Sequence, residues 1–248
     1  MGAIYVMWLR QLKKYWRSKP RMIASLGQPL LFLLAMGFGL SSIYAKGGGG
    51  NYVSFLVPGI VSMAILFTSM FTGIEIIWDR QFGFLKETLV APVPRWEIMF
   101  GRILGGATVA TFQGLIIFAV TFLVGFRPFN LLYLPIAFVF MFLIALLFTA
   151  FVTVVASRME DMQAFPILMN FFIMPIFFLS GALFPLDDVP DALRVVSSLN
   201  PLSYGVDGLR GSLIGTAHFG LGFDVLVLSA VTGSCLILGS YLFSKIQI

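Results

Sequence analysis

The sequence predicts an all-α membrane protein with six transmembrane helices. Of its 248 residues, 59% are hydrophobic and 11% are charged, whereas an ordinary soluble domain carries about 25% charged residues. The hydrophobic residues also form long uninterrupted runs, and a soluble fold of this length could not cover so much apolar surface. Lys and Arg residues stand between the runs, which is typical of the aqueous borders of membrane spans.

Six apolar stretches have the length of about 20 residues that a helix needs to cross a bilayer. We predict spans at residues 22–44, 53–78, 103–126, 132–157, 162–186 and 225–244, within a single membrane domain over 1–248. Pro166 and Pro175 lie in the fifth stretch, so we expect that helix to be kinked, with neighbouring helices satisfying the carbonyl groups that proline frees.

The distribution of basic residues predicts which side of the membrane each loop occupies. With six spans the two termini share a side, and 12 of the 16 Lys and Arg residues fall on that side. Basic residues accumulate in cytoplasmic loops, so we expect a multi-pass protein of the cell membrane with cytoplasmic N and C termini. Because the basic residues flank apolar runs, we assign the net charge of +5 to contacts with anionic membrane lipids rather than with nucleic acid.

An amphipathic basic helix is predicted at residues 3–19, before the first span. Aromatic and leucine side chains recur along one side of it, and Arg10, Lys13, Lys14 and Arg17 group on the other. A helix of this kind lies flat at the headgroup boundary of the inner leaflet. Two roles stay open for it, a simple topology anchor and a contact with a partner protein.

The largest cytoplasmic loop follows the second span and contains a short helical pattern, in the region 79–95. Phe82, Leu85 and Leu89 recur on one side of this pattern, while Lys86 and Glu87 are expected to be exposed. A short helix with an apolar ridge suits insertion into a groove on another protein. The pattern by itself favours an ordinary interfacial loop.

The external region 187–222 is too apolar for a plain loop. It divides at Asn200 and Pro201 into two short helical pieces, each of about 15 to 20 Å at 1.5 Å per residue. Both are too short to cross the core of about 30 Å. We therefore expect a re-entrant helix pair that dips into the outer leaflet and is buried in protein or lines a cavity.

The charged residues exclude several functions. None of the spans holds an ionisable residue in its middle, and Glu75 and Asp79 lie at the inner end of the second span, where we expect Arg80 and water to solvate them. Transporters driven by ion gradients usually carry ionisable groups inside the membrane. The chain also lacks a GK[ST] phosphate loop, so energy for transport must come from another protein.

Cys235 and His218 are the only residues of their kinds, which leaves no metal cluster and no Ser-His-Asp triad. We expect neither a metal nor a cofactor on this chain. Aromatic and sulfur side chains in the second and fifth spans offer a soft surface for amphipathic molecules, although packing against helices and lipid is their more common role. The candidate pathway residues are Phe67, Met70, Phe71, Asn170, Phe171, Met174 and Phe178.

Two stretches resemble the ABC-2 type permeases, the short membrane subunits of exporters of drugs, lipids and polysaccharides. The first is the run DRQFGFLKETL at 79–89 with its two following prolines, which is similar to the coupling-helix region of that family. The second is SGALFP at 180–185 followed by LNPLSY at 199–204, Asp207 and Arg210, which is similar to the signature before the last span. The resemblance covers nearly the whole chain and favours the drug and lipo-oligosaccharide branch.

The resemblance implies an exporter in which ATP and Mg²⁺ are bound by a separate ATPase subunit. Two permease copies would pair, with a homodimer favoured, and each would seat its coupling helix in an ATPase chain. The coupling residues are then Phe82, Gly83, Leu85, Lys86, Glu87 and Leu89. The outer gate is formed by Phe184, Pro185, Asn200, Pro201, Tyr204, Asp207 and Arg210, in which Asp207 and Arg210 pair as exposed ions.

Two other functions stay open. The same fold exports lipid-linked polysaccharide in part of the family, although such a channel needs hydrogen-bonding groups in which these spans are poor. A non-transporting membrane protein, such as an assembly factor or a sensor subunit, would have no ATPase partner. A soluble protein with a GxxxxGK[ST] motif encoded next to this chain would favour the exporter.

Overall fold

The computed structural model describes residues 2–41, 44, 51–90, 92–159, 161–185 and 190–244, without the side chains of Arg21, Leu85, Lys86, Leu89 and Ser244. The regular elements in these residues are all helices. They are α1 (Gly2–Arg17), α2 (Lys19–Gly39), α4 (Tyr52–Gln81), α5 (Phe84–Val90), α6 (Arg95–Thr121), the 3-10 helix η1 (Leu131–Tyr133), α7 (Leu134–Arg158), α8 (Ala164–Phe178), α9 (Asp191–Leu199), α10 (Pro201–Ile214) and α11 (Leu221–Ser244).

The centre of the bundle is α4, which is apolar around most of its circumference. Helices α2, α6, α7 and α10 pack around it, and most of its side chains between Phe55 and Ile77 are buried. A helix that is hydrophobic on all sides belongs in the interior of a bundle. Its start is set by Asn51, whose side chain accepts a hydrogen bond of 3.0 Å from the amide of Val53 and so satisfies one of the free amides of the first turn.

Small residues allow the central helices to approach closely. Gly106 lies where α4, α6 and α7 meet, and a Cβ atom at this position would stand 2.7 Å from the Thr149 methyl group and 2.9 Å from that of Thr72. Close backbone approach at Gly is a common basis of helix association in membranes, where dispersion and hydrogen bonds replace the hydrophobic driving force.

Within the described residues, five helical stretches are long and apolar enough to cross a membrane. They are Met22–Gly39, Tyr52–Gln81, Arg95–Thr121, Leu131–Arg158 and Leu221–Phe243, and they confirm the helices predicted for the first four spans and the last. Residues 42 and 43, at the end of the first predicted span, lie outside the described residues.

The fifth predicted span differs from the structure. A helix was expected over 162–186, but α8 has 15 residues, or about 22 Å at 1.5 Å per residue. The chain leaves the helix after Phe178 and continues as a turn, in which Ser180, Gly181 and Leu183 are buried. Gly181 adopts a φ of 72° there, a left-handed conformation that glycine accommodates without strain. An apolar run can therefore contain a helix and a buried turn.

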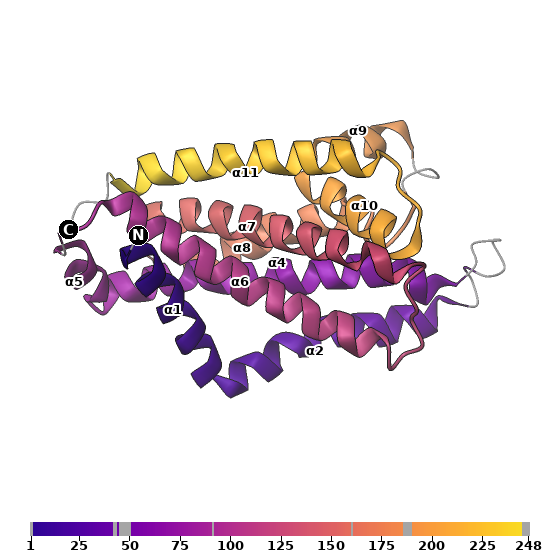
Figure 1. Ribbon diagram of the computed structural model, residues 1–248, viewed down its shortest axis with the longest axis horizontal. Helices are drawn as coiled ribbons and strands as arrows, with labels where there is room; N and C mark the ends of the chain where they lie inside the picture. The colour runs from indigo at the N-terminus through magenta and orange to yellow at the C-terminus, as the bar shows by residue number, and fades with distance from the viewer. Residues whose placement is uncertain are drawn as a thin grey trace.

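The two ends of the bundle are different. The start of α1, the end of α11 and α5 lie at one end, and α9 and α10 lie at the other (Figure 1). The start of α1 and the end of α11 thus lie on the same side, as predicted. That this side is the cytoplasmic one stays a prediction. We call the first the inner end and the second the outer end.

Helix α1 is amphipathic as predicted, while its expected position at the headgroup boundary stays a prediction. It packs against α6, a candidate span, and runs obliquely to the long axis of the bundle (Figure 1). Ile4 meets Gly101 near the start of α6, whereas the Tyr15 hydroxyl donates a hydrogen bond to Oε1 of Gln113. The contacts of α1 with α6 thus extend from Gly101 to Gln113.

Candidate functional site

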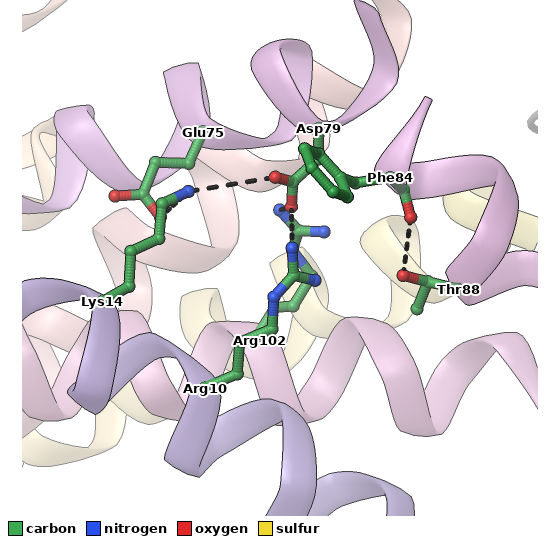
Figure 2. Close-up of polar contacts among 7 residues, drawn as sticks. All are labelled: Arg10, Lys14, Glu75, Asp79, Phe84, Thr88 and Arg102. Atoms are coloured by element: carbon green, nitrogen blue, oxygen red, sulfur yellow. Dashed lines mark hydrogen bonds and ion pairs between the residues drawn. The ribbon is translucent and has the colours of Figure 1, made fainter. Parts of the chain in front are cut away.

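The helix at the inner end, α5, is joined to the central helix by a very short link. Only Phe82 and Gly83 separate the end of α4 from the start of α5. Gly83 has a φ of 81°, which lets the chain reverse after the last turn of α4. Within α5 the Thr88 hydroxyl donates a 2.8 Å hydrogen bond to the carbonyl oxygen of Phe84 (Figure 2). A displacement of α5 therefore acts on α4 almost directly.

A cluster of five charged side chains holds the end of α4 in place, and we call it the inner ionic cluster (Figure 2). Asp79 Oδ2 accepts a 2.7 Å hydrogen bond from Nη2 of Arg102 and lies 3.4 Å from Nη2 of Arg10. Lys14 Nζ lies 3.3 Å from Oε2 of Glu75 and 3.8 Å from Oδ1 of Asp79. The cluster joins α1, α4 and α6 at one point.

The acidic members of this cluster are buried, which corrects the expectation that water solvates them. The side chains of Glu75 and Asp79 are only 5% and 7% exposed, and basic groups of α1 and α6 lie against them instead. Arg102 is buried as well, and among the described residues its Nε and Nη1 have no hydrogen-bond partner. Burial of charges is costly unless they are paired, so each member depends on the others.

The predicted coupling residues lie at this end, in α5 and in the two-residue link before it. Phe82 precedes α5 and is 69% exposed, and Phe84, its first residue, is 52% exposed. Glu87 is exposed too. The side chains of Leu85, Lys86 and Leu89 lie outside the described part, so the apolar ridge with Leu85 and Leu89 and the exposure of Lys86 stay predictions. The exposed rings of Phe82 and Phe84 nevertheless give this end an apolar surface for contact with another protein.

Most of the predicted pathway residues lie on the surface of the chain. Phe171 is 75% exposed, and Phe71, Phe178 and Asn170 are exposed as well. Met70 is buried, while Phe67 and Met174 are half-buried. The side of α8 that packs inward carries instead Phe165, Met169, Ile173 and Phe177. The aromatic surface of α4 and α8 therefore faces outward from the chain.

At the outer end, Asn200 connects the helix pair to α8. Its Nδ2 donates a 2.6 Å hydrogen bond to the carbonyl oxygen of Ile176, and its Oδ1 accepts from the amide of Leu202 at the start of α10. Pro201 occupies the first turn of α10, where no amide is needed. The predicted division of the region at these two residues is confirmed. Residues 187–189 of that region lie outside the described part.

The two helices of this pair differ in burial. α10 packs against α4, α7 and α11, whereas α9 is mostly exposed, with Leu199 79% exposed. Tyr204 links them through a 2.6 Å hydrogen bond from its hydroxyl to the carbonyl oxygen of Ser198. Helical backbone that is buried in protein satisfies the requirement for a re-entrant element, while its depth in the bilayer stays a prediction.

Asp207 and Arg210 contact different partners, which corrects the expected exposed ion pair. Asp207 is buried and accepts hydrogen bonds of 2.8 to 2.9 Å from the amides of His218 and Phe219. Arg210 donates a 2.8 Å hydrogen bond to the carbonyl oxygen of Gly181 and stacks 4.1 Å above the centre of the Phe55 ring. Spacing along a helix could not reveal these contacts, because both partners come from distant segments.

A pocket of about 230 Å³ lies between these segments at the outer end. Its walls come from α4, α10, the turn after α8 and the loop before α11. Of the predicted gate residues, Pro185, Asp207 and Arg210 line it, and Phe184 is half-buried nearby in sequence. Pro185, Asp207 and Arg210 therefore lie together at this pocket. Asn200, Pro201 and Tyr204 instead contribute to the structure of the helix pair.

The inner ionic cluster was missed as a unit by sequence reasoning. Glu75 and Asp79 stand one turn apart on a span, and Arg10 and Lys14 are spaced by four on α1, which was a usable signal for two facing helices. At the outer end Asp224 is fully buried, and its carboxyl group lies beside that of Asp207. No group of three His, Cys, Asp or Glu among those residues is arranged for a metal.

Comparisons with known proteins agree with this architecture. The family model described as ABC-2 type transporter matches residues 2–214. The chain is 30% identical over 215 residues to a protein named putative transport permease ycf38 of Cyanophora paradoxa, covering 84% of this chain and 72% of that protein. It is 28% identical to nodulation protein J of Rhizobium meliloti, covering 84% and 80%.

A third relative is the inner membrane transport permease YadH of Escherichia coli, which is 25% identical over 219 residues, covering 86% of this chain and 83% of that protein. The family match spans α1 to α10 and so includes the inner ionic cluster, α5 and the outer helix pair. This chain therefore belongs to the ABC-2 type transporter family, as a membrane permease.

Proposed function

We propose that this permease is the membrane subunit of an ATP-driven exporter for an amphipathic, drug-like or lipid-like substrate. ATP and Mg²⁺ would be bound by a separate ATPase subunit. The observation that carries the proposal is the arrangement of α5, which projects at the inner end with exposed Phe82 and Phe84 and is linked by two residues to the most buried helix of the bundle.

The inner ionic cluster gives this arrangement a mechanical role. Asp79 stands three residues before Phe82 and is held by Arg10 and Arg102. A force on α5 therefore reaches α1, α4 and α6 together instead of bending the end of α4 alone. Rigid-body shifts of packed helices of this kind are a common form of switching, and here they would alternate the access of the substrate to the two sides.

The exposed face of α8 supports pairing with a second copy of the chain. Asn170 carries an amide group and is exposed on this otherwise apolar helix. An amide that faces hydrocarbon without a hydrogen bond costs roughly 2–7 kcal/mol, so this face is better covered by protein. In a homodimer the outward aromatic rings of α4 and α8 would line a shared pathway.

Replacing Phe82 by Asp tests the coupling role. Because Phe82 is exposed and outside a helix, we expect Phe82→Asp to leave the melting temperature of the permease unchanged. The variant should abolish the stimulation of the ATPase by substrate in lipid discs, since a charge would be placed in an apolar contact. Phe129→Asp is the matched control, because Phe129 is 76% exposed and lies in the loop between α6 and η1. Normal stimulation in Phe82→Asp would refute the assignment.

A further inference from the structure

A groove runs between α1 and α6 on the surface of the bundle. One pocket in it has a volume of about 380 Å³ and is lined by Leu12, Lys13, Tyr15, Trp16, Arg17, Thr108, Val109 and Phe112. A second, more open pocket of about 580 Å³ is lined by Ile4, Tyr5, Trp8 and Leu104. The volume of the first lies within the range of about 300–1,000 Å³ that is usual for ligand sites.

The sequence of α6 explains why the two helices touch at one end and separate at the other. A Cβ at Gly101 would lie 2.7 Å from the carbonyl oxygen of Ile4, and a Cβ at Gly105 would lie 2.7 Å from Cβ of Gln11. These glycines bring the backbones together. Beyond them Phe112 replaces glycine on this side, and its ring stands 6.3 Å from that of Trp16. The groove opens where the side chains become large.

The polar groups along the walls are already satisfied within the protein. Trp8 donates a 3.1 Å hydrogen bond to the hydroxyl of Thr108, which donates in turn to the carbonyl oxygen of Leu104. The Tyr15 hydroxyl donates to Gln113. Because these donors are used, the walls offer an apolar slot and no fixed hydrogen bonds for a sugar or a peptide. An alkyl chain matches such a slot best.

The charged side chains of α1 are divided between two directions. Arg10 and Lys14 turn to the acidic residues of α4. Lys13 and Arg17, one helical turn apart, border the groove, and in the described part of the chain neither has a carboxylate within ion-pair distance. Two cations beside an apolar slot in a membrane protein therefore favour a ligand that has both an anionic group and an alkyl chain.

We propose that this groove binds an anionic phospholipid of the inner leaflet. Its phosphate contacts Lys13 and Arg17, and one acyl chain lies between α1 and α6 against Leu12, Trp16 and Phe112. Basic residues near a membrane surface attract anionic lipids, and burial of the chain in the slot adds the apolar contribution. The site is separate from the outward face of α4 and α8 and does not depend on the exporter proposal.

The experiment uses the full chain in lipid discs and reads the proximity of a lipid to Trp16. In one series, discs of phosphatidylcholine contain a small fraction of phosphatidylglycerol with brominated acyl chains. In a parallel series, the brominated lipid is phosphatidylcholine. The part of the tryptophan fluorescence quenching that is lost in Trp16→Phe is assigned to this groove. We expect strong, saturable quenching by the brominated phosphatidylglycerol and only the level of random contact by the brominated phosphatidylcholine.

Charge variants then identify the phosphate contact. Lys13→Gln and Arg17→Gln should each weaken the apparent affinity for phosphatidylglycerol about fivefold, in line with the usual contribution of a basic residue near anionic lipid. Arg158→Gln is the control, because Arg158 is an exposed basic residue at the inner end of α7, and it should leave the affinity unchanged. Leu12→Trp, which fills the slot, should abolish the saturable component while Lys13 and Arg17 are retained.

Three outcomes would overturn the proposal. Equal quenching by the two brominated lipids would show a surface without headgroup preference. If Arg158→Gln weakened the affinity for phosphatidylglycerol as much as Lys13→Gln, the lipid would be attracted by the overall positive charge of the protein and not by this groove. Absence of quenching of Trp16 by either lipid, together with a loss of dimer in Trp16→Ala, would show that a second copy of the chain covers the groove.

Discussion

Removal of the Asp79 carboxylate is expected to destabilise the inner end of the bundle strongly. In Asp79→Asn the side chain keeps its size, but Arg102, Arg10 and Lys14 lose the charge on which they converge. Arg102 suffers most, since it is buried and has two guanidinium nitrogens without a hydrogen-bond partner among the described residues already. Breaking a buried ion pair by removing one partner costs about 3–5 kcal/mol. We expect a loss at the lower end of that range, because Glu75 remains nearby.

The free energy of unfolding can be measured by titration of the permease in lipid–detergent micelles with a denaturing detergent. Asp191→Asn is the control, because the pair of Asp191 with Arg194 is exposed, and exposed pairs contribute little. The double variant Asp79→Leu with Arg102→Leu should recover most of the loss, since replacing both partners removes the uncompensated charge. A loss in Asp79→Asn as small as in the control would refute the idea that the cluster holds α1, α4 and α6 together.

Two further predictions concern the outer end and the exposed face of α8. Asp207→Asn should lower the free energy of unfolding by about 1–3 kcal/mol and speed amide exchange at His218 and Phe219, because the neutral amide oxygen accepts these two hydrogen bonds more weakly than a carboxylate does; unchanged exchange would contradict the assigned contacts. Asn170→Cys, made in a Cys235→Ser background, should form cross-linked dimers in membranes, whereas Leu226→Cys on the exposed side of α11 should not, and a monomeric Asn170→Cys would count against pairing through α8.

Hydropathy was sufficient to find the long helices, because the length and apolarity of a span are local properties. It failed at α8, where an apolar run of the expected length contains Pro175, a helix end at Phe178 and a buried turn. Apolar character shows that a segment avoids water, but protein and lipid both provide that environment. The sequence therefore predicted a longer helix than the one that forms.

The site was predicted unevenly for a related reason. The division of the outer helix pair at Asn200 was visible, since an Asn-Pro step is a local signal for the start of a helix. The partners of Asp79 and Asp207 were not, because they come from α1, α6 and the loop before α11. The periodicity of α1 likewise showed an apolar face without showing that α6, rather than lipid, covers part of it.

The docking of an ATPase subunit at α5 can be tested most directly with a photo-reactive amino acid in place of Phe82. The permease is purified in complex with its ATPase, irradiated and analysed by mass spectrometry, and the same amino acid at Phe129 serves as the reference. We predict an adduct at position 82 with a chain that contains a GxxxxGK[ST] motif, and none at position 129. The absence of an adduct at position 82, or an equal yield at both positions, would contradict the account.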